Sequence, residues 1–225
     1  MTERTYKNDM TMMLVMHDAL RRELERMARI TARTDDDPRH MLQTALGWEL
    51  FKNYLRVHHN AEDDALWPPI RQAIGERADD LVVIDAMEAE HATVDPGLNA
   101  IDAALADRES GPERLGAVFD RLVGGLGGHL THEEKDALPL IDAYATPEVM
   151  QRFGLAHSSR IGAGVSRYLP WLLDSASAER TSAALATLPD PVRQAYHDEW
   201  QPAYAAVNLW AARQRPLSPG SAATG

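Results

Sequence analysis

Residues 128–140 read G-H-L-T-H-E-E-K-D-A-L-P-L, in which His129 precedes Glu133 by four positions and Pro139 follows that glutamate by six. Residues four apart on an α-helix lie one above the other on the same face. If this stretch is helical, an imidazole and a carboxylate project from it in one direction. Such a pair can supply one wall of a metal site.

An earlier stretch repeats this arrangement. Residues 57–69 read V-H-H-N-A-E-D-D-A-L-W-P-P, so that His58 precedes Glu62 by four and Pro68 again follows the glutamate by six. A single pair of this kind arises readily by chance, whereas two copies with the same proline offset do not. We therefore interpret the two stretches as two walls of one metal site.

Four long segments carry apolar residues at alternating steps of three and four, the period of an amphipathic helix. They are residues 9–32, 39–67, 80–107 and 112–138. Each apolar stripe spends one central position on a histidine, where a titratable side chain must find a partner. Short connections between the segments favour an all-α, antiparallel up-and-down four-helix bundle. The inward histidines are His17, His58, His91 and His129.

The rest of the chain divides into two parts by its composition. Further helical patterns begin at Pro147 and continue through residues 162–173, 179–188 and 191–214, the last with Trp200, Tyr204 and Trp210. Residues 216–225 are rich in Pro, Ser, Gly and Ala, which is typical of disorder. We expect a bundle at residues 1–145, a C-terminal helical extension at 146–215 and a disordered tail at 216–225.

Composition restricts the classes of function. The 225 residues carry a net charge of −11, which argues against nucleic-acid and anionic-membrane partners. The absence of cysteine excludes disulfides, iron–sulfur ligation and thiolate nucleophiles. No apolar run approaches the ~18 residues of a membrane-spanning helix, and residues 1–11 lack the apolar core of a signal peptide. We expect a cytoplasmic protein.

The candidate ligands indicate the kind of metal. Six nitrogen and oxygen ligands without sulfur exceed a tetrahedral zinc site, and calcium or magnesium sites would not use four imidazoles. Imidazole with carboxylate suits iron, with manganese or a mixed pair as alternatives. Two bridging glutamates and four terminal histidines fit a two-metal centre. The candidate ligands are His17, His58, Glu62, His91, His129 and Glu133.

Two alternatives to this centre remain open. A ferritin-like site needs two Glu-x-x-His motifs, and only Glu88 with His91 provides one. A structural bundle without metal would require the two glutamates and four histidines to hydrogen-bond one another.

Several other polar residues lie close to the ligand pattern. Tyr54 is one turn before His58 on the same face, where its hydroxyl would lie near the site or bind the metal directly. His59 and Asp63 fall on the neighbouring face, so we expect them to be solvated or to support the ligands from outside. His157 would either cap one end of the site or lie at the surface. The remaining histidines, expected at the surface, are His40, His132 and His197.

Four glycines, at positions 124, 125, 127 and 128, interrupt the helical pattern before His129. A helical glycine costs about 0.5–1 kcal/mol relative to alanine, so a cluster needs a reason. The glycines would allow either the close approach of a neighbouring helix or the entry of a small ligand beside His129.

The order H…H-x-x-x-E…H…H-x-x-x-E, with a proline after each glutamate, resembles the hemerythrin-like family of HHE cation-binding domains over residues 9–144. The resemblance implies a four-helix bundle with two iron ions in a non-haem, oxo- or hydroxo-bridged centre. Transferred to this chain, it implies that His17 and His58 bind one iron, His91 and His129 the other, and Glu62 and Glu133 bridge them.

The sequence departs from the oxygen-carrying members of that family at one position. They have a fifth histidine one turn beyond the third-helix histidine, where this chain has Asp95 followed by Pro96. With four histidines, each iron keeps an open position unless Tyr54, Asp95 or His157 fills it.

Two open positions favour a catalase- or peroxidase-like oxidoreductase that reacts with small oxidants. The substrates would be hydrogen peroxide, nitric oxide or both, and Tyr54 would supply a proton or an electron. The alternative is reversible O2 binding, or iron or oxygen sensing, without turnover.

The ligand assignment predicts opposite results for two pairs of substitutions. His129→Ala and Glu133→Ala should lose metal because each removes a ligand, whereas His132→Ala and His197→Ala should keep it. Elemental analysis of the four purified variants measures this difference. Equal metal content in all four would refute the assignment.

Overall fold

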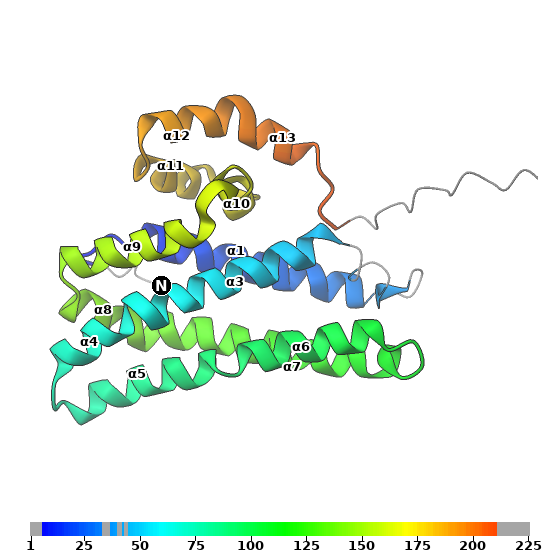
Figure 1. The fold of residues 1–225 in the computed structure, drawn as a ribbon, viewed down its shortest axis with the longest axis horizontal. Helices are drawn as coiled ribbons and strands as arrows, with labels where there is room; N and C mark the ends of the chain where they lie inside the picture. Colours follow the sequence, from blue (N-terminus) through cyan, green and yellow to red (C-terminus); the bar gives the residue numbers. More distant parts are fainter. Residues whose placement is uncertain (1–5, 33–36, 40–41, 43–44, 211–225) are drawn as a thin grey trace, which may run out of the picture.

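The computed structural model describes residues 6–32, 37–39, 42 and 45–210, and these form helices and connections without a strand (Figure 1). The bundle consists of α1 (Thr11–Thr31), α3 (Leu46–Ala65), the consecutive helices α5 (Ala78–His91) and α6 (Val94–Ala106), and α7 (Gly111–His132). The all-α bundle with additional C-terminal helices is therefore confirmed. No helix in the described ranges is long and apolar enough to cross a bilayer.

Prolines divide two of the expected helices. Helix α3 ends at Ala65, and α4 (Trp67–Ile74) begins with Pro68 and Pro69 in its first turn, where a missing N–H is tolerated. The third segment is interrupted between α5 and α6. Pro96 cannot donate a hydrogen bond to the carbonyl of Ala92, which explains a break just after His91, the last residue of α5.

The fourth segment changes its winding at Glu133. Helix α7 continues into a π-helical turn, Glu133–Ala137, and then into α8 (Leu138–Tyr144). The N–H of Leu138 donates to the carbonyl of Glu133, five residues back. Pro139 has no N–H for the carbonyl of Lys135, and its ring would collide with that carbonyl in a regular α-helix. The extra residue per turn therefore begins at a candidate ligand, as π turns at functional sites often do.

Two apolar clusters lie on either side of the histidines along the bundle. On α1, Met13 belongs to one cluster and Leu20 to the other, and His17 lies between them. On the fourth segment, Leu126 and Ala137 take the corresponding places around His129. The polar side chains thus form one layer that is sealed on both sides by apolar packing.

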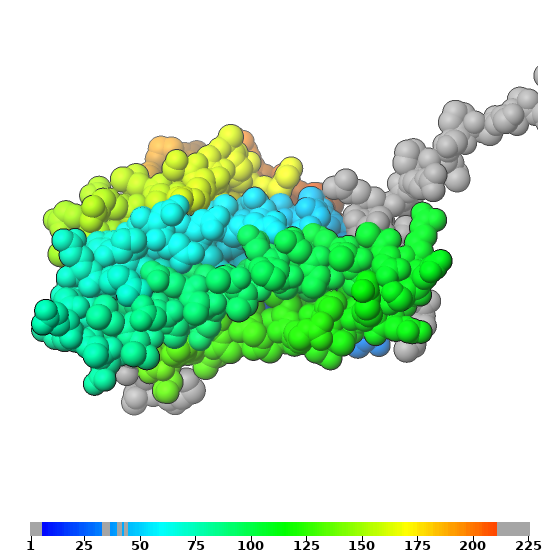
Figure 2. Space-filling model, turned by 60° about the horizontal axis from the view of Figure 1, so that its bottom comes forward, coloured from blue at the N-terminus to red at the C-terminus, as the bar shows by residue number. Residues whose placement is uncertain are grey.

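The C-terminal extension packs along α1 and α3 (Figure 1). Figure 2 shows it along the α3 edge, while the α5–α7 face stays uncovered. Its last described helix ends at Ala205, earlier than the expected position 214. Residues 211–225, which include the expected tail, lie outside the described residues. The extension comprises α9 (Pro147–Ile161), a 3₁₀ turn (Gly162–Gly164), α10 (Val165–Leu173), α11 (Ala178–Ala186), α12 (Asp190–Ala195), a π turn (Tyr196–Trp200) and α13 (Gln201–Ala205).

A buried carboxylate anchors the end of the extension to α1. Glu23 is fully buried and accepts hydrogen bonds from Arg22 Nε at 2.8 Å and from Trp210 Nε1 at 2.9 Å. Next to it, the N–H of Gly47 donates to the carbonyl of Leu209 at 2.8 Å. A methyl group at Gly47 would overlap the indole of Trp210, so this contact requires glycine.

The glycine cluster of α7 does not serve helix packing. A methyl group at position 124, 125, 127 or 128 would meet no atom within 4 Å apart from its own helix and chain neighbours. The close approach of a neighbouring helix is therefore wrong as an explanation. Gly125 and His129 do line a small cavity of about 50 Å³, together with Glu90.

Two glycine-to-alanine substitutions should change stability in opposite directions. Gly124→Ala should raise the free energy of unfolding by about 0.5–1 kcal/mol, because it removes backbone entropy without a clash. Gly47→Ala should lower it by about 1–3 kcal/mol, because the methyl group displaces Trp210. Urea denaturation of the two variants and the wild type measures both effects. Destabilisation by Gly124→Ala would contradict the open surroundings of α7.

Candidate metal centre

Seven buried side chains from four segments of the bundle converge in two adjacent groups. The ligand atoms within each group lie within 4.8 Å of one another. We call the first the three-histidine group and the second the two-histidine group. The three-histidine group is His59, His91 and His129, and the two-histidine group is His17, His58, Glu62 and Glu133.

The two glutamates of the two-histidine group also face the three-histidine group. Glu62 Oε1 is 3.3 Å from Nε2 of His58, and its Oε2 is 3.5 Å from Nε2 of His91. Glu133 Oε2 is 3.1 Å from Nε2 of His17 and 3.7 Å from Nε2 of His129. Each carboxylate therefore faces one histidine of each group, which is the arrangement that a bridging carboxylate needs.

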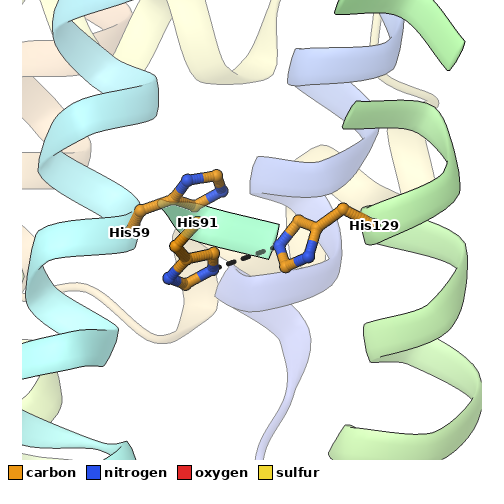
Figure 3. A group of neighbouring side chains, drawn as sticks. All are labelled: His59, His91 and His129. Atoms are coloured by element: carbon orange, nitrogen blue, oxygen red, sulfur yellow. Dashed lines mark hydrogen bonds between the residues drawn. The ribbon is translucent and has the colours of Figure 1, made fainter. Parts of the chain in front are cut away.

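The three-histidine group brings ring nitrogens together (Figure 3). His91 Nε2 and His129 Nε2 are 3.1 Å apart, and the rings of His59 and His91 stack at 3.9 Å. The Nδ1 atoms of His91 and His129 each contact a carboxylate, and an Nδ1–H that donates there leaves Nε2 with a lone pair in the neutral ring. Two lone pairs that face each other at this distance repel unless a proton or a cation lies between them.

Many polar atoms of the seven side chains have no hydrogen-bond partner in the described structure. A buried polar group in this state costs free energy that a partner would recover. The imidazole nitrogens and carboxylate oxygens of these side chains approach one another at ion-pair distances of 3.1–3.7 Å. This donor set fits a pair of cations. The unpartnered atoms are Nε2 of His17 and His58, both ring nitrogens of His59, and both carboxylate oxygens of Glu62 and Glu133.

The two buried glutamates of the centre also need positive charge beside them if both are to be ionised. Burial and the neighbouring Glu133 raise the pKa of Glu62 well above its usual range. Burial acts in the same direction on Glu133, but His17, His129 and His91 together outweigh it and lower the pKa of Glu133 to about 2. Burial acts to lower the pKa of His17, but Glu133 and Glu134 together raise it to about 9. Two adjacent buried carboxylates cannot both ionise without a cation nearby.

Three further carboxylates orient the histidine rings from outside. Asp63 contacts Nδ1 of His91 at 2.7 Å, and Glu90 contacts Nδ1 of His129 at 2.8 Å. A carboxylate at Nδ1 fixes the ring so that Nε2 points inward and is unprotonated. On the other side of the centre, Glu134 Oε1 contacts Nδ1 of His17 at 2.9 Å.

The structure corrects the expectation for His59. This residue is neither solvated nor an outer support, because it is 4% exposed and belongs to the three-histidine group. Adjacent residues on an α-helix point about 100° apart. His58 therefore faces His17 on α1, while His59 faces His91 on α5. Asp63, expected in the same role, does support a ligand from outside.

Asp95, one of three residues left open for completing the coordination, lies away from the centre. Its carboxylate is 64% exposed and pairs with Nε of Arg56 at 2.6 Å on the surface. Tyr54 is buried one turn before His58, and its ring contacts Tyr168 and Trp171 at 4.9 and 4.7 Å. His157 is half-buried, with its ring 6.3 Å from that of His58.

The other histidines divide as follows. His197 is exposed, as expected. His132 is partly exposed and shares Glu90 with the centre, since its Nδ1 lies 2.8 Å from Glu90 Oε1. His40 lies outside the described residues.

A pocket of about 390 Å³ reaches the two-histidine group from the side of the extension. His58 forms part of its wall, and His157 lies beside it. Burial lowers the pKa of His157 to about 4, assisted by Arg160, so this ring is neutral near pH 7. The extension thus provides a route to one side of the centre.

The sequence comparisons agree with this geometry over the bundle. A family model described as the hemerythrin HHE cation binding domain matches residues 8–141. Comparison with curated proteins and with solved structures gives no match. The matched range includes all seven side chains of the two groups and stops before the extension.

Removing His59 tests its place in the three-histidine group. His59→Ala should lose metal from that group because two imidazoles remain where three converge. His197→Ala removes an exposed histidine and serves as the control. Elemental analysis after dialysis against a weak chelator compares the two variants with the wild type. Full metal content in His59→Ala would show that His59 is not a metal ligand.

Proposed function

Because this chain belongs to the hemerythrin HHE cation-binding domain family, we propose that it is a non-haem di-iron oxidoreductase that reacts with hydrogen peroxide, nitric oxide or both. The observation that carries the proposal is the convergence of five imidazoles and two carboxylates with unpartnered buried atoms. Iron suits a mixed imidazole and carboxylate donor set and supplies the electron transfer that such reactions need.

The two metal positions would differ in their number of ligands. The three-histidine group together with Glu62 and Glu133 offers five protein ligands to one ion. His17 and His58 with the same two glutamates offer four to the other ion. A small oxidant would therefore bind on the side of His17 and His58, where fewer protein ligands are present.

The pocket at His58 favours turnover over carriage. Its volume of about 390 Å³ far exceeds what a diatomic gas needs, and its wall includes exposed residues such as Gly154 and Ser158. A carrier keeps its bound gas away from water and reductants, whereas an enzyme must admit substrate and release product. We therefore place reaction with peroxide before reversible binding.

Tyr54 remains our proposed proton or electron donor. Burial raises the pKa of Tyr54 to about 12, so its hydroxyl keeps its proton at neutral pH. Its ring packs against Tyr168 and Trp171, and this aromatic cluster lies on the side of α3 that faces the extension.

One specific observation supports a second candidate, reversible O2 binding. His59 brings the number of histidines to five and makes the two metal positions unequal. A carrier needs this inequality, with one metal fully ligated and a single position for O2. With five histidines, the argument from two open metal positions no longer favours an oxidoreductase over an O2 carrier.

Two measurements on the iron-loaded protein distinguish these candidates. On addition of hydrogen peroxide, an oxygen electrode should record O2 evolution, or a peroxide assay should record consumption with a reductant. Tyr54→Phe should keep its iron and react more slowly, while Glu133→Ala should lose both iron and reaction.

An O2 carrier would give the opposite results in these experiments. If peroxide is stable with the iron-loaded protein, and the reduced protein gains a visible band in O2 that disappears under argon, the protein is a carrier. A Tyr54→Phe variant that reacts at the wild-type rate would remove this residue from the mechanism.

A further inference from the structure

The pocket at His58 belongs to this chain's own C-terminal extension as much as to the bundle. Its bundle side comes from the start of α1 and from His58 of α3, and its extension side comes from α9, α10, the turn between them and the start of α12. Figure 1 shows α9 lying along α3 with α10 above it. The family match ends at residue 141, so these walls lie outside the matched domain. The side chains that shape the pocket include Met12, Met13, Met16, Phe153, Val165 and Leu169.

The wall carries no formal charge among the described residues that form it, since none is Asp, Glu, Lys or Arg. Its polar side chains are His58, His157, Ser158 and Tyr168. The hydroxyl of Tyr168 is already engaged, as it donates to the sulfur of Met16 at 3.8 Å. Burying a charged ligand without an opposite charge is costly, so this wall selects against ions.

The size and the composition of the pocket suit an organic molecule. Pockets for small organic ligands usually enclose about 300–1,000 Å³ and combine an apolar wall with a few polar groups. Three methionines on one wall add side chains that adapt to irregular apolar shapes. Peroxide, nitric oxide and O2 need neither this volume nor this wall.

We propose that the pocket is a binding site for an uncharged, largely apolar organic molecule, such as a neutral aromatic compound, held between α1, α9 and α10 with one end at His58 and His157. The molecule would then lie next to the two-histidine group of the candidate metal centre. This site is independent of the oxidant that the centre uses, because it depends on the extension and on the shape of the pocket.

Binding is measured with a neutral probe, N-phenyl-1-naphthylamine, whose fluorescence rises in apolar surroundings. The full-length protein as purified should bind it saturably. 1-Naphthol should displace the probe at a concentration about tenfold or more below that of 1-naphthoate, which carries a charge on the same ring system.

Substitutions in the wall locate the site. Gly154 lines the pocket on α9, and a side chain there meets no atom within 4 Å at its Cβ. Gly154→Phe should therefore fill the pocket and abolish probe binding without disturbing the fold. Gly116→Phe is the matched control, since Gly116 on α7 is equally open but is not part of the pocket wall. Ser158→Phe, at an exposed position of the wall, provides a second block.

The probe-binding results either support or overturn the proposed site. Probe binding that is lost in Gly154→Phe and Ser158→Phe, kept in Gly116→Phe and selective for 1-naphthol supports the proposal. Absent binding, binding that the wall variants leave unchanged, or equal competition by 1-naphthoate overturns it. Because these readouts involve no turnover, failure of the peroxide reaction would leave this result standing, and failure of probe binding would leave the peroxide reaction standing.

Discussion

The structure depends on the burial of two carboxylates and five imidazoles in one layer of a helical bundle. Apolar clusters close this layer at both ends along the bundle, and many polar atoms of these side chains are buried away from water. Within the described residues the side chains leave many of their own polar atoms unpartnered. A pair of cations resolves this conflict, because it gives each inward nitrogen and oxygen a partner and allows both glutamates to ionise. The convergence is therefore an argument for metal as well as a description of the fold.

The backbone places these side chains through local irregularities. The break after His91 and the π turn at Glu133 both precede a proline, at Pro96 and Pro139. The helices themselves remain amphipathic, so the apolar seams align the bundle while the prolines adjust the ends of the ligand segments. Outside carboxylates then fix the ring orientations. Asp63 and Glu90 act in this way on the histidines of α5 and α7.

The regular part of this arrangement could be predicted from sequence. Helical periodicity identifies His17 and His91 as inward residues, and the repeated His-x-x-x-Glu spacing identifies the two glutamates. Periodicity did not identify His59 as inward, because it is adjacent to His58 and so lies off the apolar stripe that contains His58. It serves a second group on another side of α3, and only the positions of α1 and α5 around α3 reveal this. The available signal was the H-H pair itself.

Other features depend on tertiary contacts that periodicity does not contain. The role of Glu90 follows from the packing of α5 against α7, and its only sequence signal is that it adjoins His91. The pocket results from how α9 and α10 pack on the bundle, so no sequence motif predicts it. The role of Asp95 stayed open at the sequence level, because spacing does not show where a side chain points when a proline follows it. The break before Val94 turns that carboxylate outward to Arg56.

These features make the extension the part that distinguishes this chain from a simple bundle. Its helices cover α1 and α3, the two helices that carry His17 and His58, and leave the other side of the bundle bare (Figures 1 and 2). The proposed metal position with fewer protein ligands would thus face the pocket, while the three-histidine group lies on the far side of α3. Access and reactivity would therefore be confined to one metal.

The most direct test of the central claim is an anomalous difference map, recorded at the iron absorption edge from crystals of protein expressed with ample iron. The account predicts two peaks, one among His59, His91 and His129 and one beside His17 and His58, with Glu62 and Glu133 between them. A single peak, no peak, or peaks away from these seven side chains would contradict it.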